Sequence, residues 1–469
     1  MSWLLLVVST FGISLDCPDV ISLAQGLRMN IKQPSIFTVI QSDCCTANGV
    51  GCDGGPRVIA IKWSGLGLDG TLQDTYLPNN LQNLVLANNR IIGNIVALPS
   101  TLQNIDVAGN LLNGSLPLLP TGLLTLNASQ NQFSGSLPTL PNNLTEFRAN
   151  RNKLTGAIPM LPSSLQKFDV SGNVLNGSLP SLPIRILLFD ASQNQVSGSI
   201  PTLPNCLIEI RLNQNKISGI IPILPITLQF LKLWNNKLNS SIPALPSSLE
   251  YLDLSHNQLV GTLPSPLPNG LEFLRVHNNQ LSGNVPSLPL PLYDLWLGNS
   301  GFPGNYFSGT IMLNRPTNIR INDNLISNVI ILDLSQLIYC DLSNNPLLGS
   351  PNISELTICI KNNLYFESKS TAIQIITNRF SETSKYTINE APHSELLKIH
   401  STTRLIQTIM LETVLPFTRP KILIVVLFQL MRLSINTVIL GFAIYTTPFS
   451  RELKTRLIKR KKENLDESF

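Results

Sequence analysis

The chain has 469 residues, of which 43% are hydrophobic, and a formal net charge of +5 at pH 7. This is enough apolar material for an ample core, and so modest a charge gives no reason to expect a nucleic acid partner. Thirty-three prolines would suggest disorder, but most of them stand at fixed places in a repeat.

Residues 1–14, MSWLLLVVSTFGIS, form a short apolar segment that ends with small residues. Such a segment predicts a secretory signal peptide, although it carries no Lys or Arg at its start. The alternative is a buried N-terminal strand.

Residues 15–57 contain four cysteines, Cys17, Cys44, Cys45 and Cys52, and begin with the apolar spacing of a helix. We predict a cap here, because the core of the first repeat would otherwise face water. A zinc site is the alternative, but the segment lacks the ligand spacing and the histidines that such sites use. Disulfides, and with them an oxidising compartment, are therefore the favoured interpretation.

Residues 58–350 form about fourteen copies of one unit, seen most clearly at Leu245–Ser265, and a period near 20 residues is typical of a solenoid. Its skeleton is L-P-x-x-L-x-x-L-x-L-x-x-N-x-L-x-G-x-L-P. An asparagine marks the register, mostly every 21 residues, at Asn89, Asn110, Asn131, Asn152, Asn173, Asn194, Asn215, Asn236, Asn257, Asn279, Asn324 and Asn345. We expect Ser300 to take the same place after Asn279, and Leu66 to take it in the first copy.

The residue pattern of one unit predicts its local structure. Leu252 and Leu254 alternate with Asp253, so the leucines point to one side of a short strand and Asp253 to the other. Asn257 follows where the chain must turn, since its side chain can bond nearby backbone and it tolerates left-handed geometry. The two prolines of L-P-x-L-P exclude a helix in the other half. One copy buries too little apolar area to offset the ordering of its backbone, so the copies must stack into a parallel sheet.

These repeats resemble those of the leucine-rich repeat family. The segment NKLTGAIP at Asn152–Pro159 is similar to the plant-type extracellular subclass, and L-P-x-L-P is similar to the shorter repeats of bacterial secreted effectors. The resemblance implies an α/β-type leucine-rich repeat solenoid that is predominantly β. It would be a curved, right-handed stack with a parallel sheet on its concave side and non-helical segments on its convex side.

The N-terminal cysteines follow the frame C…CC…GVxC, which resembles the cap of polygalacturonase-inhibitor-like proteins of the same family. The resemblance implies that Cys17 pairs with Cys44 and that Cys45 pairs with Cys52. A second cap is predicted at residues 351–366, and we expect Cys340 and Cys359 to pair across the last turn of the stack. Cys206 is then left over, and we interpret it as a small buried apolar side chain.

Six N-x-S/T sequons occur in the repeats and just after them, at Asn113, Asn127, Asn143, Asn176, Asn239 and Asn352. Chance is one explanation, because N-G-S is part of the repeat. Given secretion, we predict glycosylation at all but Asn127, which would project from the face of the sheet.

Residues 421–447 include a segment long and apolar enough to span a bilayer. Arg432 opposes insertion by about 2.5–3.5 kcal/mol, but the surrounding apolar residues favour it by roughly 5–9 kcal/mol. We therefore predict a transmembrane helix, with a buried or interfacial helix as the alternative. Gln429, Arg432 and Asn436 would share one face, which favours a partner helix in the membrane.

The segments on either side of this span differ in charge. Residues 367–420 are rich in Ser, Thr, Lys and Glu and would form a partly disordered stalk. Residues 448–469 are basic, which places this tail in the cytoplasm and the repeats outside. A nuclear localisation signal at KRKK is the alternative.

No constellation of residues indicates catalysis. The histidines at 256, 277, 393 and 400 form no metal-binding or triad pattern, and the sequence has no phosphate-binding loop, nucleophile elbow or paired-cysteine redox motif. We therefore expect no enzyme activity, no cofactor and no metal.

Binding is the remaining class of function, and the outward residues of the strands predict where it occurs. They form a column of Val85, Asp106, Asn127, Arg148, Asp169, Asp190, Arg211, Lys232, Asp253, Arg275, Trp296, Arg320 and Asp341. Arg and Trp are frequent anchors of binding sites, and Arg can bind carboxylates bidentately. The candidate ligand-binding residues are Arg211, Lys232, Trp234, Arg275, His277 and Trp296. The alternative is that these are solvated strand residues balancing neighbouring aspartates.

Together these features predict a single-pass, type I plasma membrane glycoprotein with extracellular repeats. It would recognise an extracellular protein, peptide or glycan as a non-catalytic, receptor-like protein. The alternative is a soluble secreted or wall-associated inhibitor or scaffold; an intracellular effector is a third possibility, which the cysteine cap and the sequons oppose.

Overall fold

The structure is a computed structural model that describes residues 16–55, 57–72, 77–95, 97–299 and 304–345. The chain divides into two units, Met1–Asn378 and Arg379–Phe469, and all described residues belong to the first. The predicted signal peptide, second cap, stalk, transmembrane helix and basic tail, with Asn352, Cys359, Gln429, Arg432 and Asn436, lie outside the described residues. Within the described ranges no helix has the length and apolar character needed to cross a bilayer.

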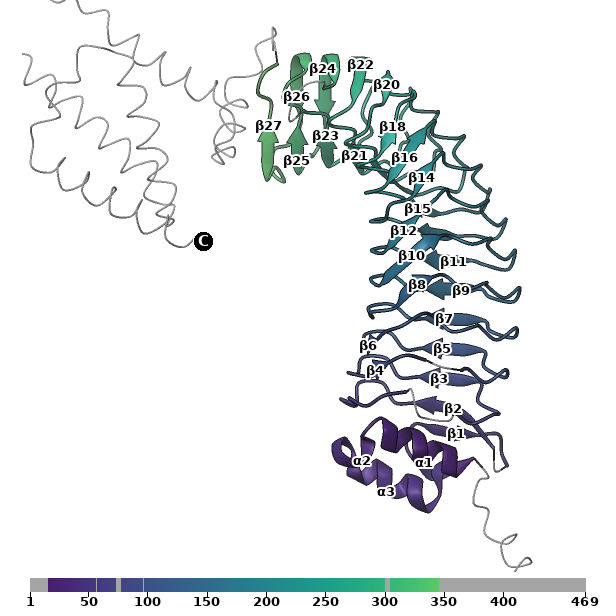
Figure 1. Cartoon of the computed structure of the whole chain (residues 1–469). Helices are drawn as coiled ribbons and strands as arrows, with labels where there is room; N and C mark the ends of the chain where they lie inside the picture. The colour runs from purple at the N-terminus through teal and green to yellow at the C-terminus, as the bar shows by residue number, and fades with distance from the viewer. Residues whose placement is uncertain (1–15, 56, 73–76, 96, 300–303, 346–469) are drawn as a thin grey trace, which may run out of the picture. The chain divides into compact units, whose positions relative to one another are not determined.

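The first unit begins with a helical cap, at one end of the stack in Figure 1. It consists of α1 (Cys17–Gly26), α2 (Met29–Lys32), α3 (Pro34–Ser42) and the 3₁₀-helix η1 (Cys44–Thr46). The structure contains both disulfides that the resemblance implies, with S–S distances of 2.08 Å for Cys17–Cys44 and 2.03 Å for Cys45–Cys52. Val20, Leu23 and Leu27 of the cap are fully buried and belong to the same core as the repeats, so the cap closes the first end of the stack.

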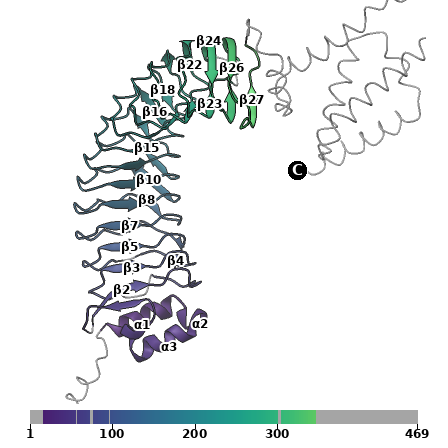
Figure 2. The same cartoon turned by 180° about the vertical axis from the view of Figure 1, so that it is seen from behind.

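Each repeat contributes one short strand to a 15-stranded sheet, whose strands lie side by side in chain order (Figures 1 and 2). Neighbouring strands are parallel from β2 onward, and only the β1–β2 pair is antiparallel. The strands are β1 (Val50–Cys52), β2 (Val58–Lys62), β3 (Asn83–Val85), β5 (Asn104–Asp106), β7 (Thr125–Asn127), β9 (Glu146–Arg148), β11 (Lys167–Asp169), β13 (Leu188–Asp190), β15 (Glu209–Arg211), β17 (Phe230–Lys232), β19 (Tyr251–Asp253), β21 (Phe273–Arg275), β23 (Asp294–Trp296), β25 (Asn318–Arg320) and β27 (Tyr339–Asp341).

A second strand follows the turn in most repeats and pairs, again in parallel, into four smaller sheets of two to four strands. These strands are β4 (Ile92–Gly93), β6 (Leu111–Leu112), β8 (Ser134–Ser136), β10 (Lys153–Ala157), β12 (Val174–Asn176), β14 (Ser197–Gly198), β16 (Lys216–Gly219), β18 (Lys237–Leu238), β20 (Val260–Gly261), β22 (Gln280–Asn284), β24 (Tyr306–Leu313) and β26 (Leu325–Ile331). The L-P-x-L-P half contains no helix, and every helix of the described residues lies in the cap. A parallel, predominantly β solenoid is therefore confirmed.

The core is a set of straight ladders along the stack. Leu231, Leu252, Leu274 and Leu295 pair in register on successive strands, and all are buried. In three consecutive repeats phenylalanine takes this position, and the rings of Phe147, Phe168 and Phe189 stack with centroids 5.6 and 5.3 Å apart. These pairs show that successive repeats of 21 or 22 residues return this apolar side chain to the same height in the core.

The register asparagines join each repeat to the one before it. Asn257 Nδ2 donates to Leu233 O of the preceding repeat at 3.0 Å and to Leu254 O of its own repeat at 3.1 Å. Its Oδ1 accepts from the backbone N–H of Leu238, also in the preceding repeat, at 3.1 Å. The same acceptor contact recurs at Asn89, Asn110, Asn131, Asn152, Asn173, Asn194, Asn215, Asn236, Asn279, Asn305, Asn324 and Asn345.

Two details of this asparagine ladder differ from the sequence-based expectation. Asn305, not Ser300, takes the place after Asn279, since its side chain bonds Leu281 N and Val276 O. The residue with left-handed backbone geometry is the one before the ladder asparagine, for example His256 with φ 55° before Asn257. The asparagine is therefore selected for its hydrogen bonds rather than for its backbone geometry.

A second polar contact joins the outer halves of the repeats. The hydroxyl of Ser248 donates to Ile226 O and Leu228 O of the preceding repeat, at 2.8 and 2.7 Å. Cys206 occupies the equivalent position, and its Sγ lies 2.8 and 3.1 Å from two carbonyls of the preceding repeat. The interpretation of Cys206 as a buried apolar side chain is therefore wrong, because the thiol is half-exposed and substitutes for a hydroxyl.

We predict that Asn257→Ala lowers the free energy of unfolding by about 2–3 kcal/mol, because it leaves buried backbone groups of two repeats without partners. Denaturant unfolding measures the change. Gln258→Ala, at the exposed neighbouring residue, is the matched control and should change stability by less than about 0.5 kcal/mol. Equal effects of the two substitutions would show that the ladder does not stabilise the stack.

Candidate functional site

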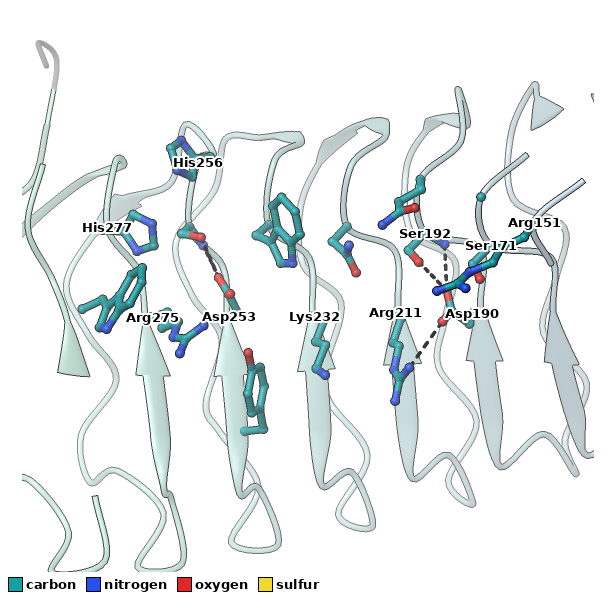
Figure 3. A pocket seen from close by; sticks show the side chains of 17 residues that line it. Arg151, Ser171, Asp190, Ser192, Arg211, Lys232, Asp253, His256, Arg275 and His277 are labelled. Carbon is teal, nitrogen blue, oxygen red and sulfur yellow. Dashed lines mark hydrogen bonds and ion pairs between the residues drawn. The ribbon is translucent and has the colours of Figure 1, made fainter. Parts of the chain in front are cut away.

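The solvent-facing side of the 15-stranded sheet, here called the open face, carries three columns of side chains. The middle column is the outward residue of each strand, such as Lys232 in β17 or Arg275 in β21. The residue two positions earlier, such as Tyr251, and the residue two positions later, such as Trp234, point the same way because side chains alternate along a strand. Figure 3 shows Arg211, Lys232, Asp253 and Arg275 on four successive strands of this face.

The structure brings all six sequence-predicted ligand residues into one hollow of the open face. This first hollow extends from Arg151 to Trp296 and has a volume of about 560 Å³. Arg211, Lys232, Trp234, Arg275, His277 and Trp296 all line it. A volume of this size lies within the range of small-ligand sites, but the first hollow is an open groove rather than an enclosed cavity.

Two of the predicted cations are neutralised within the face. Arg211 forms ion pairs with Glu209 of its own strand and with Asp190 of the preceding strand. Arg275 binds Asp294 of the next strand bidentately, with Nε–Oδ1 at 2.7 Å and Nη2–Oδ2 at 2.8 Å. Asp294 is only 2% exposed, so this pair is part of the packed face. The alternative interpretation, that such residues balance neighbouring carboxylates, describes both arginines well.

The aspartates of the middle column are held by serines two residues later. Asp253 Oδ1 accepts from the backbone N–H and the hydroxyl of Ser255 at 3.1 and 2.6 Å, and Asp190 makes the same contacts with Ser192. Burial raises the pKa of both carboxyl groups, while the serine hydrogen bonds lower it. These carboxylates are therefore fixed close to the sheet and project little into the first hollow.

Lys232 has no carboxylate within 4 Å among the described residues, unlike the two arginines. Its Nζ lies 4.5 Å from the centre of the Tyr251 ring, which is a cation–π distance. Burial, and after it the positive charge of Arg211, lowers the pKa of the ammonium group. Half-buried Trp234 lies two residues later on the same face, so a charge and an aromatic ring are presented together.

A stack of alternating rings and guanidinium groups begins at the far end of the first hollow and continues beyond it. Arg275 Cζ lies 4.4 Å from the centre of the Trp296 ring, and Arg320 Cζ lies 4.1 Å from it. Arg320 also lies 4.3 Å from the ring of Tyr339. Since these residues come from four neighbouring strands, β21 to β27, the stack fixes side chains across the whole end of the sheet.

His277 completes this end of the face. Its ring lies 5.0 Å from that of His256 and 5.2 Å from that of Trp296, between centroids. Burial, and then the charges of His256, Arg275 and Arg320, lowers the pKa of His277 to about 3. The imidazole is thus neutral at physiological pH and contributes hydrogen-bonding groups rather than charge.

No group of three or more His, Cys, Asp or Glu side chains that could hold a metal ion occurs among the described residues. The cysteines of the cap are used in disulfides. The arrangement on the open face can bind through charge, hydrogen bonds and rings.

Comparison with known families identifies the unit. The family described as Leucine Rich Repeat matches residues 248–269, which surround β19. The strand and the asparagine contact of this matched unit recur along the described stack. The solenoid is built of leucine-rich repeats.

Solved structures similar to this leucine-rich repeat chain include proteins of different kinds. The plant peptide hormone receptor RGFR1, solved with RGF2, is 25% identical, with a TM-score of 0.43, covering 60% of this chain and 57% of that chain. YopM from Yersinia enterocolitica is 28% identical, with a TM-score of 0.42, covering 58% and 65%. A plant ice-binding protein is 23% identical, with a TM-score of 0.43, covering 58% and 89%.

The chain thus spans little more than half of the receptor chain that it resembles. No curated protein sequence matches it.

Sequence reasoning missed one column of the leucine-rich repeats. Tyr251, Phe273 and Asp294 stand two positions before the middle column. Tyr251 and Asp294 contact a cation of the neighbouring strand, and Phe273 contacts Arg275 of its own strand. The rings of Tyr251 and Phe273 lie 4.7 Å apart. The signal was available, because period-2 alternation also directs this position outward.

We predict that the NMR signals of the His277 ring keep the chemical shifts of a neutral imidazole from pH 8 down to pH 4, because its pKa lies at about 3. A pH titration of the histidine Cε1–H signals measures this, and His277→Asn assigns the signal by removing it. A midpoint near pH 6.5 would show that the ring is solvated rather than enclosed by His256, Trp296 and the two arginines.

Proposed function

We propose that this protein is a non-catalytic, receptor-like membrane glycoprotein that recognises an extracellular protein, peptide or glycan. The open face, which we equate with the concave face of related solenoids, would hold the ligand. The observation that carries the proposal is the convergence of the six predicted residues, from four repeats, on the first hollow. Aromatic side chains beside an unpaired cation are typical of the centres of binding interfaces.

Features outside the first hollow support an extracellular location. Two disulfides in the cap are stable only in an oxidising compartment. Asn113, Asn143, Asn176 and Asn239 are exposed and accessible to a glycosyltransferase, whereas Asn127 is half-buried in β7 with its Oδ1 bonded to Ser129. With a span at residues 421–447, the repeats would lie outside the plasma membrane, and a partner could meet Gln429, Arg432 and Asn436.

Lys232→Gln combined with Trp234→Leu should weaken ligand binding at least about tenfold, because it removes the unpaired cation and the ring beside it. Binding is measured by interferometry with a ligand selected from secreted proteins, peptides and glycans. The matched control is Lys237→Gln, an exposed lysine on β18 of the same repeat but outside the first hollow. Undiminished binding by the double variant would place the ligand elsewhere.

Membrane attachment is tested on the full chain expressed in eukaryotic cells. We expect the protein to stay in the pellet after alkaline carbonate extraction, and its repeats to be removed by protease added to intact cells. Glycosidase treatment should lower its apparent mass. Release into the medium would instead support the alternative, a soluble secreted or wall-associated inhibitor or scaffold.

A further inference from the structure

Arg320 differs from the other arginines of the middle column in having no carboxylate partner among the described residues. Arg148 pairs with Glu146 at 2.7 Å, Arg211 pairs with Glu209 and Asp190, and Arg275 pairs with Asp294. In each case the acid comes from the same strand or from an adjacent one.

Around Arg320, the positions that carry these acids near the other arginines carry uncharged side chains. Two residues before it on its own strand, where Arg211 has Glu209, stands Asn318. On the next strand, where Arg275 has Asp294, stands Tyr339. Asp341 lies opposite Arg320 in register, but its Oδ1 accepts from the backbone N–H and hydroxyl of Ser343 at 3.1 and 2.7 Å.

Arg320 is nevertheless held in place. Its guanidinium lies over the rings of both Trp296 and Tyr339, at 4.1 and 4.3 Å. A side chain fixed in this way loses little further entropy when a ligand binds. The charge is therefore both unneutralised and preorganised.

Three buried polar atoms near one another have no hydrogen-bond partner: Arg320 Nε, Trp296 Nε1 and His277 Nδ1. All three residues line a second hollow of about 680 Å³, which shares His256, His277 and Trp296 with the first hollow. An unsatisfied buried donor, such as Arg320 Nε or Trp296 Nε1, costs about 1–3 kcal/mol, which a bound acceptor would recover. On Arg275 the Nε and Nη2 edge is occupied by a carboxylate; on Arg320 the Nε of that edge is unpartnered.

We propose that the second hollow binds the carboxylate of an aspartate or glutamate side chain in an extended peptide, and that Arg320 receives it as Arg275 receives Asp294. This inference rests on the proposed function of the open face as a ligand-binding surface. It adds the chemical class of the ligand and a second site on that face. Because the two hollows adjoin through shared residues, an extended chain can occupy both.

The stack favours a peptide over an acidic sugar. Sugars are usually held by packing a ring against an aromatic face, but Trp296 lies in register between Arg275 and Arg320, and both guanidinium groups lie over its ring. A carboxylate needs only the edge of the guanidinium, where planar bidentate hydrogen bonds form.

The second hollow also contains two acidic side chains, Asp323 and Asp341. Its overall charge therefore does not by itself favour an acidic ligand. Asp323 accepts hydrogen bonds from Asn322 and Asn344 at 2.6 Å each, and Asp341 is held by Ser343. These bonds hold both carboxylates in place but leave them negatively charged. An incoming acid is therefore selected by the geometry of Arg320 rather than by a positive field.

The test uses the full chain and two pools of N-acetylated, C-terminally amidated 12-residue peptides of mixed sequence. One pool carries a single Glu at each position in turn, and the other carries Gln at the same positions. We expect the Glu pool to bind the wild-type protein about 10- to 100-fold more tightly than the Gln pool, as for a hydrogen bond to a charged group.

Arg320→Gln should abolish this preference, and Arg320→Lys should retain only part of it, because lysine keeps the charge but not the bidentate edge. Arg148→Gln is the matched control, since Arg148 is already neutralised by Glu146, and it should leave the preference unchanged. Unchanged thermal unfolding of each variant shows that the solenoid is intact.

A second measurement does not require tight binding. The sequence contains four tryptophans, so the indole N–H signals can be assigned by substitution. N-acetyl-glutamate amide should shift the Trp296 signal in the wild-type protein but not in Arg320→Gln, and N-acetyl-glutamine amide should shift it in neither.

Equal binding of the two pools by the wild-type protein, or a Glu preference that survives Arg320→Gln, would overturn the inference. An Arg320-dependent preference for oligouronates but not for Glu peptides would also overturn it, in favour of an acidic glycan. The proposed function fails separately, since it depends on Lys232 and Trp234. Loss of ligand binding in that double variant without any effect of Arg320 would retain the function and reject the inference.

Discussion

The structure depends on satisfying backbone polar groups where each repeat turns away from the long sheet. The turn lies against the next repeat, so its N–H and C=O groups are excluded from water and must find partners in the protein. Asn257 provides them with one acceptor and two donors that reach two repeats at once. Its Oδ1 and Nδ2 supply both kinds of group on a short side chain. Leucines create the driving force for stacking, whereas the asparagine ladder fixes the height and rotation at which repeats stack.

This fixed register determines the open face. Because neighbouring strands pair residue for residue, position 232 always lies beside positions 211 and 253, whatever side chains they carry. The surface is therefore a lattice whose spacing is set by buried residues and whose chemistry is set independently by three positions in each repeat. Such a lattice can acquire a binding site by substitution at a few outward positions without disturbing the core, and the first hollow, with side chains from many repeats, fits this description.

The sequence predicted features that depend on one repeat or on its period, and it was less successful with contacts between side chains of different repeats. The period, the strands and the non-helical half followed from spacing, and the six residues of the first hollow followed from spacing together with residue type. The pairing of Arg275 with Asp294 did not, because it requires the diagonal reach of a guanidinium between two columns. Asn305 was missed because an insertion shifts it from the regular spacing, so that only its contacts identify it. Cys206 was misassigned because its position hydrogen-bonds to the neighbouring repeat, a role that composition does not indicate.

The number of charged residues on the open face says little about what the face can bind. Which of those residues lack an ion-pair partner says more. The middle column carries arginines and aspartates in similar measure, and most of them are engaged with each other or with serines. A face of this kind has no strong field to attract ligands of one sign, so selectivity must come from the few groups whose partners are missing. Lys232 is one such group, and Arg320 with the unsatisfied nitrogens of Trp296 and His277 is the other. An unpaired group is less stable in the free protein than a paired one. A ligand that supplies the missing partner therefore gains affinity at these groups rather than at the paired ones. The positions at which the repeat departs from its own pattern of neutralisation are therefore the ones at which we propose that a ligand binds.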